Sequence, residues 1–305
     1  MTRSGPFTPV EIAAIAAIIV IWGVNNAAAK YATEFLPPFF VGGMRFALTL
    51  AALGPFMLRP PWPDLRKIAG FILLAGPIHF SLIYLGFAMG KQLSPLAIVS
   101  QLWIPFTAVF AWPLLGERMS PVAGVGLAIA FLGVAWMSFD PHSLGDLDAI
   151  LITALAAAAW ALSAVLARKA KGVPALKLNA LTALLATPVL LGAAFATDPQ
   201  LPEKISRASL FVWACIAWAG LVSSICATTL LYWMVQRREA NRVTPYLLLS
   251  TVVSCAIGVT WMGDRISPPL VLGALVAMGG IVIVAVVERR QARAALEAAV
   301  ADPPV

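Results

Sequence analysis

Apolar runs long enough to cross a lipid bilayer recur along nearly the whole chain. A spanning helix needs about 20 mostly apolar residues, and ten runs of the sequence approach or meet that length. The breaks between them are short and carry turn residues, as in "RPPWPD" at 59–64, so no soluble domain is expected. The predicted spans are 10–29, 37–58, 68–89, 95–114, 121–138, 149–167, 174–196, 209–235, 243–262 and 268–287.

The composition agrees with a protein that is surrounded by lipid. Hydrophobic residues make up 61% of the chain and charged residues 11%, whereas a soluble domain carries roughly 25% charged residues. The three cysteines lie inside apolar runs without a paired spacing, so we expect neither a disulfide framework nor a zinc site. The sequence predicts an all-α membrane protein in contact with the lipid bilayer, with no metal and no cofactor.

Basic residues orient the predicted spans. Lys and Arg concentrate in loops on the cytoplasmic side of a membrane. If the N-terminus is cytoplasmic, basic clusters such as Arg168–Lys169 and Arg237–Arg238 lie inside, and the loop 139–148, which has three aspartates and no Lys or Arg, lies outside. We therefore expect both termini to be cytoplasmic. The same distribution explains the net charge of +7 without a nucleic-acid partner.

The second half of the sequence repeats the first. "GERMSP" at 116–121 returns as "GDRISP" at 263–268, and "IYLGFAMGKQLSPLAIVS" at 83–100 resembles "LYWMVQRREANRVTPYLLLS" at 231–250. A repeat of this length predicts two related structural units.

The predicted units are residues 10–138 and 149–287, followed by a cytoplasmic tail, 288–305. Each unit holds five spans, an odd number, so the second must enter the membrane from the opposite side. Two inverted five-helix repeats around a central cavity can exchange conformations, and this gives alternating access to a site near the midplane.

Three motifs and their order resemble the EamA family of the drug/metabolite transporter superfamily. They are "IWGVNNAAAKYA" in the first span, "PPFFVGGMRF" at the start of the second, and "LLGERMSP", which returns as "MGDRISP". The resemblance covers residues 10–287. It implies a basket-shaped bundle whose fifth and tenth helices lie at the periphery. It also implies transport of small metabolites, often the export of amino acids, across the plasma (inner) membrane of bacteria.

Polar and aromatic residues inside the spans are the candidate substrate-binding residues, because such groups are costly in lipid and face protein or water. His79 is the ionisable group placed nearest the middle of a span. It could bind substrate, relay a proton, or donate a hydrogen bond to the carbonyl of a neighbouring helix. The complete candidate set is His79, Gln101, Trp103, Tyr84, Trp22, Asn25, Asn26, Trp160, Tyr246 and Ser250.

Most of these candidates have an alternative role in holding helices together. The amides of Asn25, Asn26 and Gln101 can hydrogen-bond either a substrate or another helix. Tyr246 and Ser250 lie four residues apart and so share one helical stripe. Trp160 occupies the place in the second half that Trp22 occupies in the first. Pro105 is expected to loosen the helix that carries Gln101 and Trp103.

Charged residues near the ends of spans are interpreted mainly as structural. Arg45 could bind a substrate carboxylate, extend to the outer interface or pair with a loop acid, and we favour a structural role. Glu117–Arg118 and Asp264–Arg265 are expected to form interfacial turns after Gly116 and Gly263. Each acid then lies near the N-terminus of the helix that follows it.

The function expected from these observations is secondary transport, with export of amino acids or related amphipathic compounds first. Other metabolites or cationic drugs are alternative substrates. The chain has no phosphate-binding loop for an ATP-driven pump, and coupling is either absent or uses His79. An intramembrane lipid-linked transferase would need clustered acids or a nucleophile with its base, so we do not expect an enzyme. A channel or a membrane scaffold is a further alternative. The sequence does not set the oligomeric state.

Overall fold

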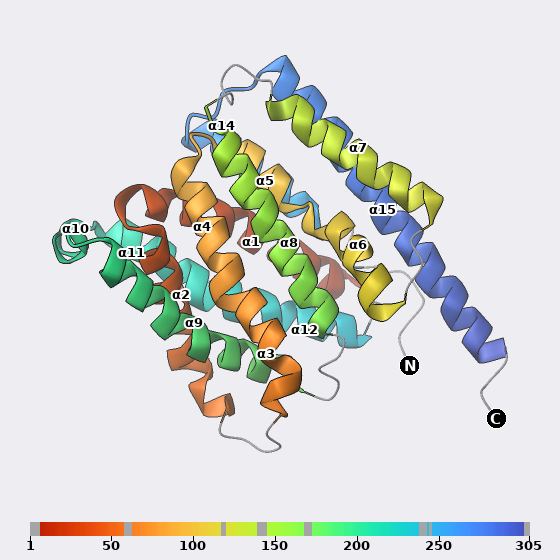
Figure 1. Ribbon diagram of the computed structural model, residues 1–305, viewed down its shortest axis with the longest axis horizontal. Coiled ribbons are helices and arrows are strands. Elements are labelled where there is room, and N and C mark those ends of the chain that lie inside the picture. Colours follow the sequence, from red (N-terminus) through yellow and green to blue (C-terminus); the bar gives the residue numbers. More distant parts are fainter. Residues whose placement is uncertain are drawn as a thin grey trace.

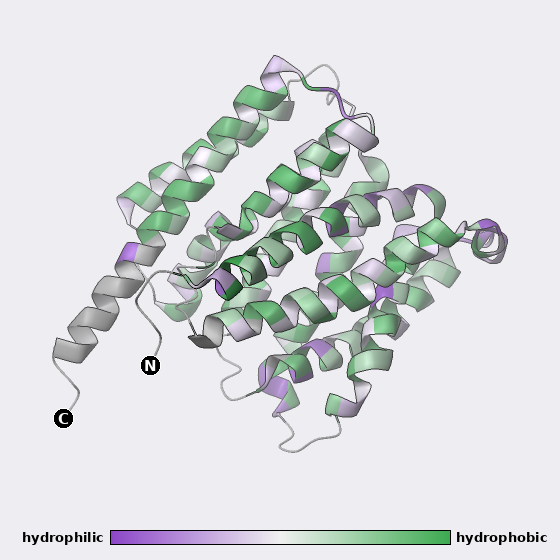
Figure 2. Ribbon diagram, turned by 180° about the vertical axis from the view of Figure 1, so that it is seen from behind, coloured by the Kyte–Doolittle hydropathy of each residue, from purple (hydrophilic) through white to green (hydrophobic). Residues whose placement is uncertain are grey.

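The computed structural model of the chain is an all-helical bundle (Figure 1). It describes residues 7–57, 63–116, 120–138, 145–167, 173–237, 243 and 246–301. No strand occurs within these ranges, which agrees with the predicted all-α class. Figure 2 shows hydrophobic residues along the helices and most of the hydrophilic residues near their ends, as expected for a bundle in a membrane.

The helices lie where the apolar runs predict them. Within the described ranges, eight helical stretches are long and apolar enough to cross a membrane. Shorter apolar helices, Pro121–Met137 and Leu249–Trp261, occupy the places of the fifth and ninth predicted spans. The helices of the first half are α1 (Pro9–Phe35), α2 (Pro38–Met57), α3 (Leu65–Leu73), η1 (Leu74–Ile78), α4 (His79–Met89), α5 (Leu93–Ser100), α6 (Trp103–Leu115) and α7 (Pro121–Ser138). Those of the second half are α8 (Leu147–Ala167), α9 (Ala175–Thr197), α10 (Leu201–Arg207), α11 (Leu210–Ala217), η2 (Trp218–Ala227), α12 (Thr228–Arg237), α14 (Leu249–Trp261) and α15 (Pro268–Ala301).

Local sequence signals set many helix ends. Thr8 and Glu11 form a capping box at the start of α1, in which each side chain accepts a hydrogen bond from the other's backbone N–H. Gly116 and Gly263 have φ angles of 71° and 79°, a left-handed conformation that other residues rarely adopt. The predicted helix ends at these two glycines are therefore confirmed.

Three spans are irregular in their interior. The predicted fourth span is broken between α5 and α6, where Gln101 and Leu102 form tight turns just before Pro105. Proline lacks the backbone N–H that would continue the helical bonding, so the predicted loosening is confirmed. The π-helical stretches η1 and η2 interrupt the spans that begin with α3 and α11. These two spans occupy equivalent places in the sequence repeat.

The two predicted halves are interleaved. The most extensive helix contacts pair a helix of one half with a helix of the other, namely α7 with α15, α2 with α9, α4 with α8, α6 with α8 and α1 with α14. Figure 1 shows α7 and α15 side by side along one edge of the bundle. Small residues along both helices allow this close approach. Any site in the interior is therefore built from both halves.

Candidate substrate-binding site

A buried arginine lies where α2, α4 and η2 meet. Arg45 Nε donates to Ser224 Oγ at 3.1 Å, and Nη1 donates to the Tyr84 hydroxyl at 3.2 Å. The guanidinium carbon lies 4.5 Å from the centre of the Phe80 ring, a cation–π contact. Arg45 is only 8% exposed. The alternatives in which it extends to the interface or pairs with a loop acid are therefore wrong, because its partners are neutral and interior.

Three sequence-predicted candidates lie beside this arginine. His79 packs against Trp160 with ring centres 5.0 Å apart and against Phe80 at 4.7 Å. Tyr84 is fully buried and packs against Phe80 at 5.8 Å. We call His79, Phe80, Tyr84 and Trp160 the aromatic cluster. It joins α4 to α8, and Arg45 lies at one side of it.

His79 makes a defined hydrogen bond to the neighbouring helix. Its Nδ1 lies 2.8 Å from the backbone oxygen of Ala156 in α8. A carbonyl can only accept, so Nδ1 carries the proton, and in the neutral ring Nε2 is then an acceptor. Among the described residues Nε2 has no hydrogen-bond partner. The predicted helix-to-helix bond is present, and no described residue bonds to the second nitrogen.

A second polar group connects the broken span to α14. Gln101 Nε2 donates to Thr251 Oγ1 at 2.6 Å, while Gln101 Oε1 accepts from the Trp103 indole at 3.2 Å. Both ends of the amide are therefore occupied by protein. Two sequence-predicted residues, Gln101 and Trp103, act here as a connection between helices of the two halves.

The remaining candidates lie on α1 and at the start of α14. Asn26 Nδ2 donates to Ser254 Oγ at 3.1 Å, which links these two helices. Asn25 is buried, and its Oδ1 has no hydrogen-bond partner in the described part of the chain. Ser250 is buried, whereas Tyr246 is 47% exposed and packs against Phe7 near the N-terminus. Trp22 packs into a separate apolar cluster with Ile18 and Met234, so the structure does not gather all ten candidates at one point.

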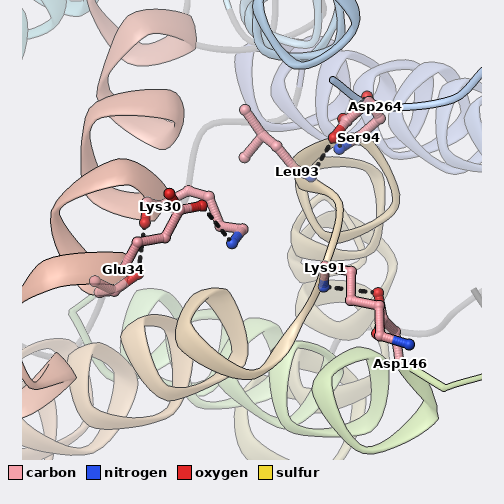
Figure 3. A network of polar contacts seen from close by, with 8 residues as sticks. Lys30, Glu34, Lys91, Leu93, Ser94, Asp146 and Asp264 are labelled. Atoms are coloured by element: carbon pink, nitrogen blue, oxygen red, sulfur yellow. Dashed lines mark hydrogen bonds and ion pairs between the residues drawn. The ribbon is translucent and has the colours of Figure 1, made fainter. Parts of the chain in front are cut away.

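A buried carboxylate from the second half caps a helix of the first half (Figure 3). Asp264 accepts hydrogen bonds from the backbone N–H groups of Leu93 at 3.0 Å and Ser94 at 2.7 Å, and from Ser94 Oγ at 2.5 Å. We call this group the Asp264 cap. The N-terminus of α5 offers unpaired N–H groups and a positive dipole end, both of which favour an anion.

The expected position of this acid needs a correction. Asp264 was expected near the N-terminus of the helix that follows, α15, but it caps α5 instead. The loop between α4 and α5 makes two further bonds: Lys91 N donates to Asp146 Oδ2 at 2.8 Å (Figure 3), and Gln92 Oε1 accepts from Arg265 N at 3.1 Å. The matching pair Glu117–Arg118 lies outside the described residues.

Sequence reasoning missed two features of this region. Phe80, which contacts both Arg45 and His79, was not selected because nothing distinguishes one phenylalanine in an apolar span from another. Ser224 was not among the candidates, and its bond to Arg45 joins residues 179 positions apart. Only the adjacency of Phe80 to His79 could have drawn attention to it.

Apolar helices that enclose buried polar groups define a multi-pass membrane protein. The chain belongs to the EamA-like transporter family, whose model matches residues 10–139 and again 147–286. It is 25% identical to an uncharacterized transporter of Archaeoglobus fulgidus, covering 88% of this chain and 96% of the relative. It is also 25% identical to a probable amino-acid metabolite efflux pump of Escherichia coli (strain K12), covering 87% and 91%. One solved crystal structure shares the fold with a TM-score of 0.59 and 17% identity, covering 93% and 99% of the two chains. As a member of this family, the chain is a membrane transporter.

Proposed function

We propose that this transporter exports amino acids or related amphipathic metabolites by alternating access across a bacterial inner membrane. The observation that carries the proposal is the buried arginine and aromatic cluster at a junction of helices from both halves. An interior site shared by two pseudo-symmetric halves is the arrangement that alternating access needs. The name of the Escherichia coli relative supports amino acids as the substrate class.

Ten spans in two inverted units, 10–138 and 149–287, remain part of the proposal. The two separate family matches support this division. Eight apolar spans and two shorter apolar helices at the remaining positions support the count. Both termini and the tail 288–305 are then cytoplasmic, because the basic loops lie on that side.

Export of cationic drugs is less consistent with the structure. The charge of Arg45 lies inside the bundle, and its described partners are neutral. A cationic substrate beside it would meet like-charge repulsion at low dielectric. A zwitterion or an anion would not.

The test of the function is transport by purified protein in liposomes. We expect labelled phenylalanine or other amino acids to exchange across the bilayer, measured with and without a pH gradient. Empty liposomes are the control. If none of the labelled amino acids crosses faster than in empty liposomes, the amino-acid proposal is wrong.

The topology leads to a separate prediction. Alkaline phosphatase fused after Val305 is expected to be inactive, because the proposed C-terminus lies in the cytoplasm. The matched control is a fusion after Gln200, in a loop that the proposal places outside, and it should be active. An active C-terminal fusion would show that the inverted arrangement is wrong.

His79 gives a prediction about coupling. Because Nδ1 is hydrogen-bonded to the Ala156 carbonyl, Nε2 is the ring atom that can take up and release a proton inside the bundle. We expect His79→Gln to keep measurable transport but to lose its dependence on the pH gradient, because an amide cannot be protonated near neutral pH. Gly192→Ala, at a position with open space around it, is the control. Unchanged rate and pH dependence in His79→Gln would remove the coupling role.

A further inference from the structure

Arg45 carries a buried charge that the described part of the protein does not neutralise. The ion pairs in that part join Lys30 with Glu34, Lys67 with Asp64, Lys204 with Asp198 and Arg207 with Glu203. None of them includes Arg45, of which only 8% is exposed. Buried charges are normally paired, because removing an ion from water is costly. A buried arginine with neutral partners therefore requires an explanation.

The hydrogen bonds around the guanidinium use only part of its donor capacity. Ser224 Oγ accepts from Nε and donates its own hydrogen bond to the backbone oxygen of Ala219 at 2.9 Å, so the orientation of the hydroxyl is set. The Tyr84 hydroxyl accepts from Nη1, and the described residues offer no acceptor for its proton. Nη2 donates to no described residue.

A structural role accounts for only part of what this arginine supplies, because the cation–π contact with Phe80 uses the charge but not the remaining donors. A neutral side chain of similar length, such as glutamine, could donate hydrogen bonds to the same two hydroxyl groups. What arginine adds is a positive charge and a further pair of donors. Both are suited to a planar carboxylate, which accepts two parallel hydrogen bonds from a guanidinium.

The surroundings agree with a ligand site. Ser224 lies in the π-helical stretch η2, and η1 ends directly before His79. Short π-helical segments occur frequently at functional sites because they disturb the regular bonding of the helix. The aromatic cluster lies beside the guanidinium and offers apolar faces for the rest of a bound molecule.

We propose that the Arg45 guanidinium, held by Ser224 and Tyr84, binds the carboxylate group of the transported compound. The ligand class is a small organic carboxylate, with Nη2 and the Tyr84 hydroxyl as its donors and the aromatic cluster beside its side chain. This assignment rests on the proposed function and specifies it: the feature of an amino acid that the protein recognises is its carboxylate.

The test compares two probes that differ in charge but little in shape. Purified protein in detergent is titrated with sodium phenylacetate and with the neutral phenylacetamide, and binding is measured calorimetrically. We expect the wild type to bind the acid at least about tenfold more tightly, because charge-assisted bonds are stronger than neutral ones. Arg45→Gln should abolish this preference. Arg45→Lys should keep a weaker preference, since a point charge replaces the paired donors.

Two further variants keep the result interpretable. Arg207→Gln removes an exposed arginine on α10 and should bind like the wild type. Tyr84→Phe removes one donor without changing charge, so it should weaken acid binding several-fold and amide binding less, because the bond to a charged acceptor is the stronger one. If Arg45→Gln does not fold, the acid and amide affinities of Tyr84→Phe test the carboxylate assignment. No preference for the acid in the wild type, or an undiminished preference in Arg45→Gln, would overturn the assignment.

The outcome is separable from that of the proposed function. If wild-type liposomes move no labelled amino acid but the Arg45-dependent preference for phenylacetate persists, the amino-acid proposal fails and the carboxylate site stands. If Arg45→Gln transports phenylalanine with an unchanged KM, the transport function stands and the carboxylate site is wrong.

Discussion

Asp264→Ala is expected to lower the free energy of unfolding by about 3–5 kcal/mol. The substitution removes the acceptor for three hydrogen bonds, two of them from the backbone N–H groups of Leu93 and Ser94. These donors are buried and lie at a helix N-terminus, so they would be left without partners. Denaturant unfolding in detergent, followed by far-UV circular dichroism, measures the loss.

Two controls separate the Asp264 cap from a general effect of removing an acid. Asp264→Asn keeps an oxygen acceptor for a backbone N–H and should lose about 1–2 kcal/mol. Glu203→Ala breaks an exposed ion pair with Arg207 and should change stability by less than about 1 kcal/mol. If Asp264→Ala were no more destabilising than Glu203→Ala, the cap would contribute nothing measurable to the fold.

Gly280→Ala is expected to destabilise the protein by about 1–3 kcal/mol through overpacking. A Cβ at this position would overlap the backbone of Ala130 and Gly126 in α7. Backbone atoms of a packed helix cannot rotate away as a flexible side chain can. α7 and α15 would have to separate, which would reduce their contact along much of their length. The same unfolding measurement detects the change.

The neighbouring residue provides a matched control. Gly279 lies on the same helix, is exposed, and has open space where a Cβ would be. Gly279→Ala should therefore be neutral or stabilise the helix by up to about 1 kcal/mol, because alanine loses less backbone entropy than glycine. Equal effects of the two substitutions would show that the close α7–α15 contact is not a source of stability.

The packing of α7 against α15 shows what glycine spacing in a sequence can predict. The seven-residue spacing of Gly126 and Gly133, and of Gly273 and Gly280, predicts a small face on each of two helices. The structure confirms both faces and places them against each other. The spacing could be read because helical periodicity is a local property of the chain. The pairing of α7 with α15 also agrees with the peripheral position implied for the fifth and tenth helices.

The candidate site was less accessible to sequence reasoning. His79, Tyr84 and Trp160 were selected, and the structure brings them together, but it assigns Gln101 and Asn26 to bonds between helices. A polar residue inside a span predicts only that it avoids lipid. Whether it meets a ligand or another helix depends on which side chains face it, and those come from distant parts of the chain.

The sequence by itself determined where most helices lie, the break before Pro105 and the ends at the two glycines, because apolar length, proline and glycine act over a few residues. It did not predict the π-helical stretches η1 and η2. Pro105 breaks the fourth predicted span, and Gly116 and Gly263 end helices as predicted. The tertiary structure alone decided which helix Asp264 caps and which residues surround Arg45. Those bonds join positions 170 or more residues apart, except the one to Tyr84, so only the interleaving of the two halves brings their partners within reach.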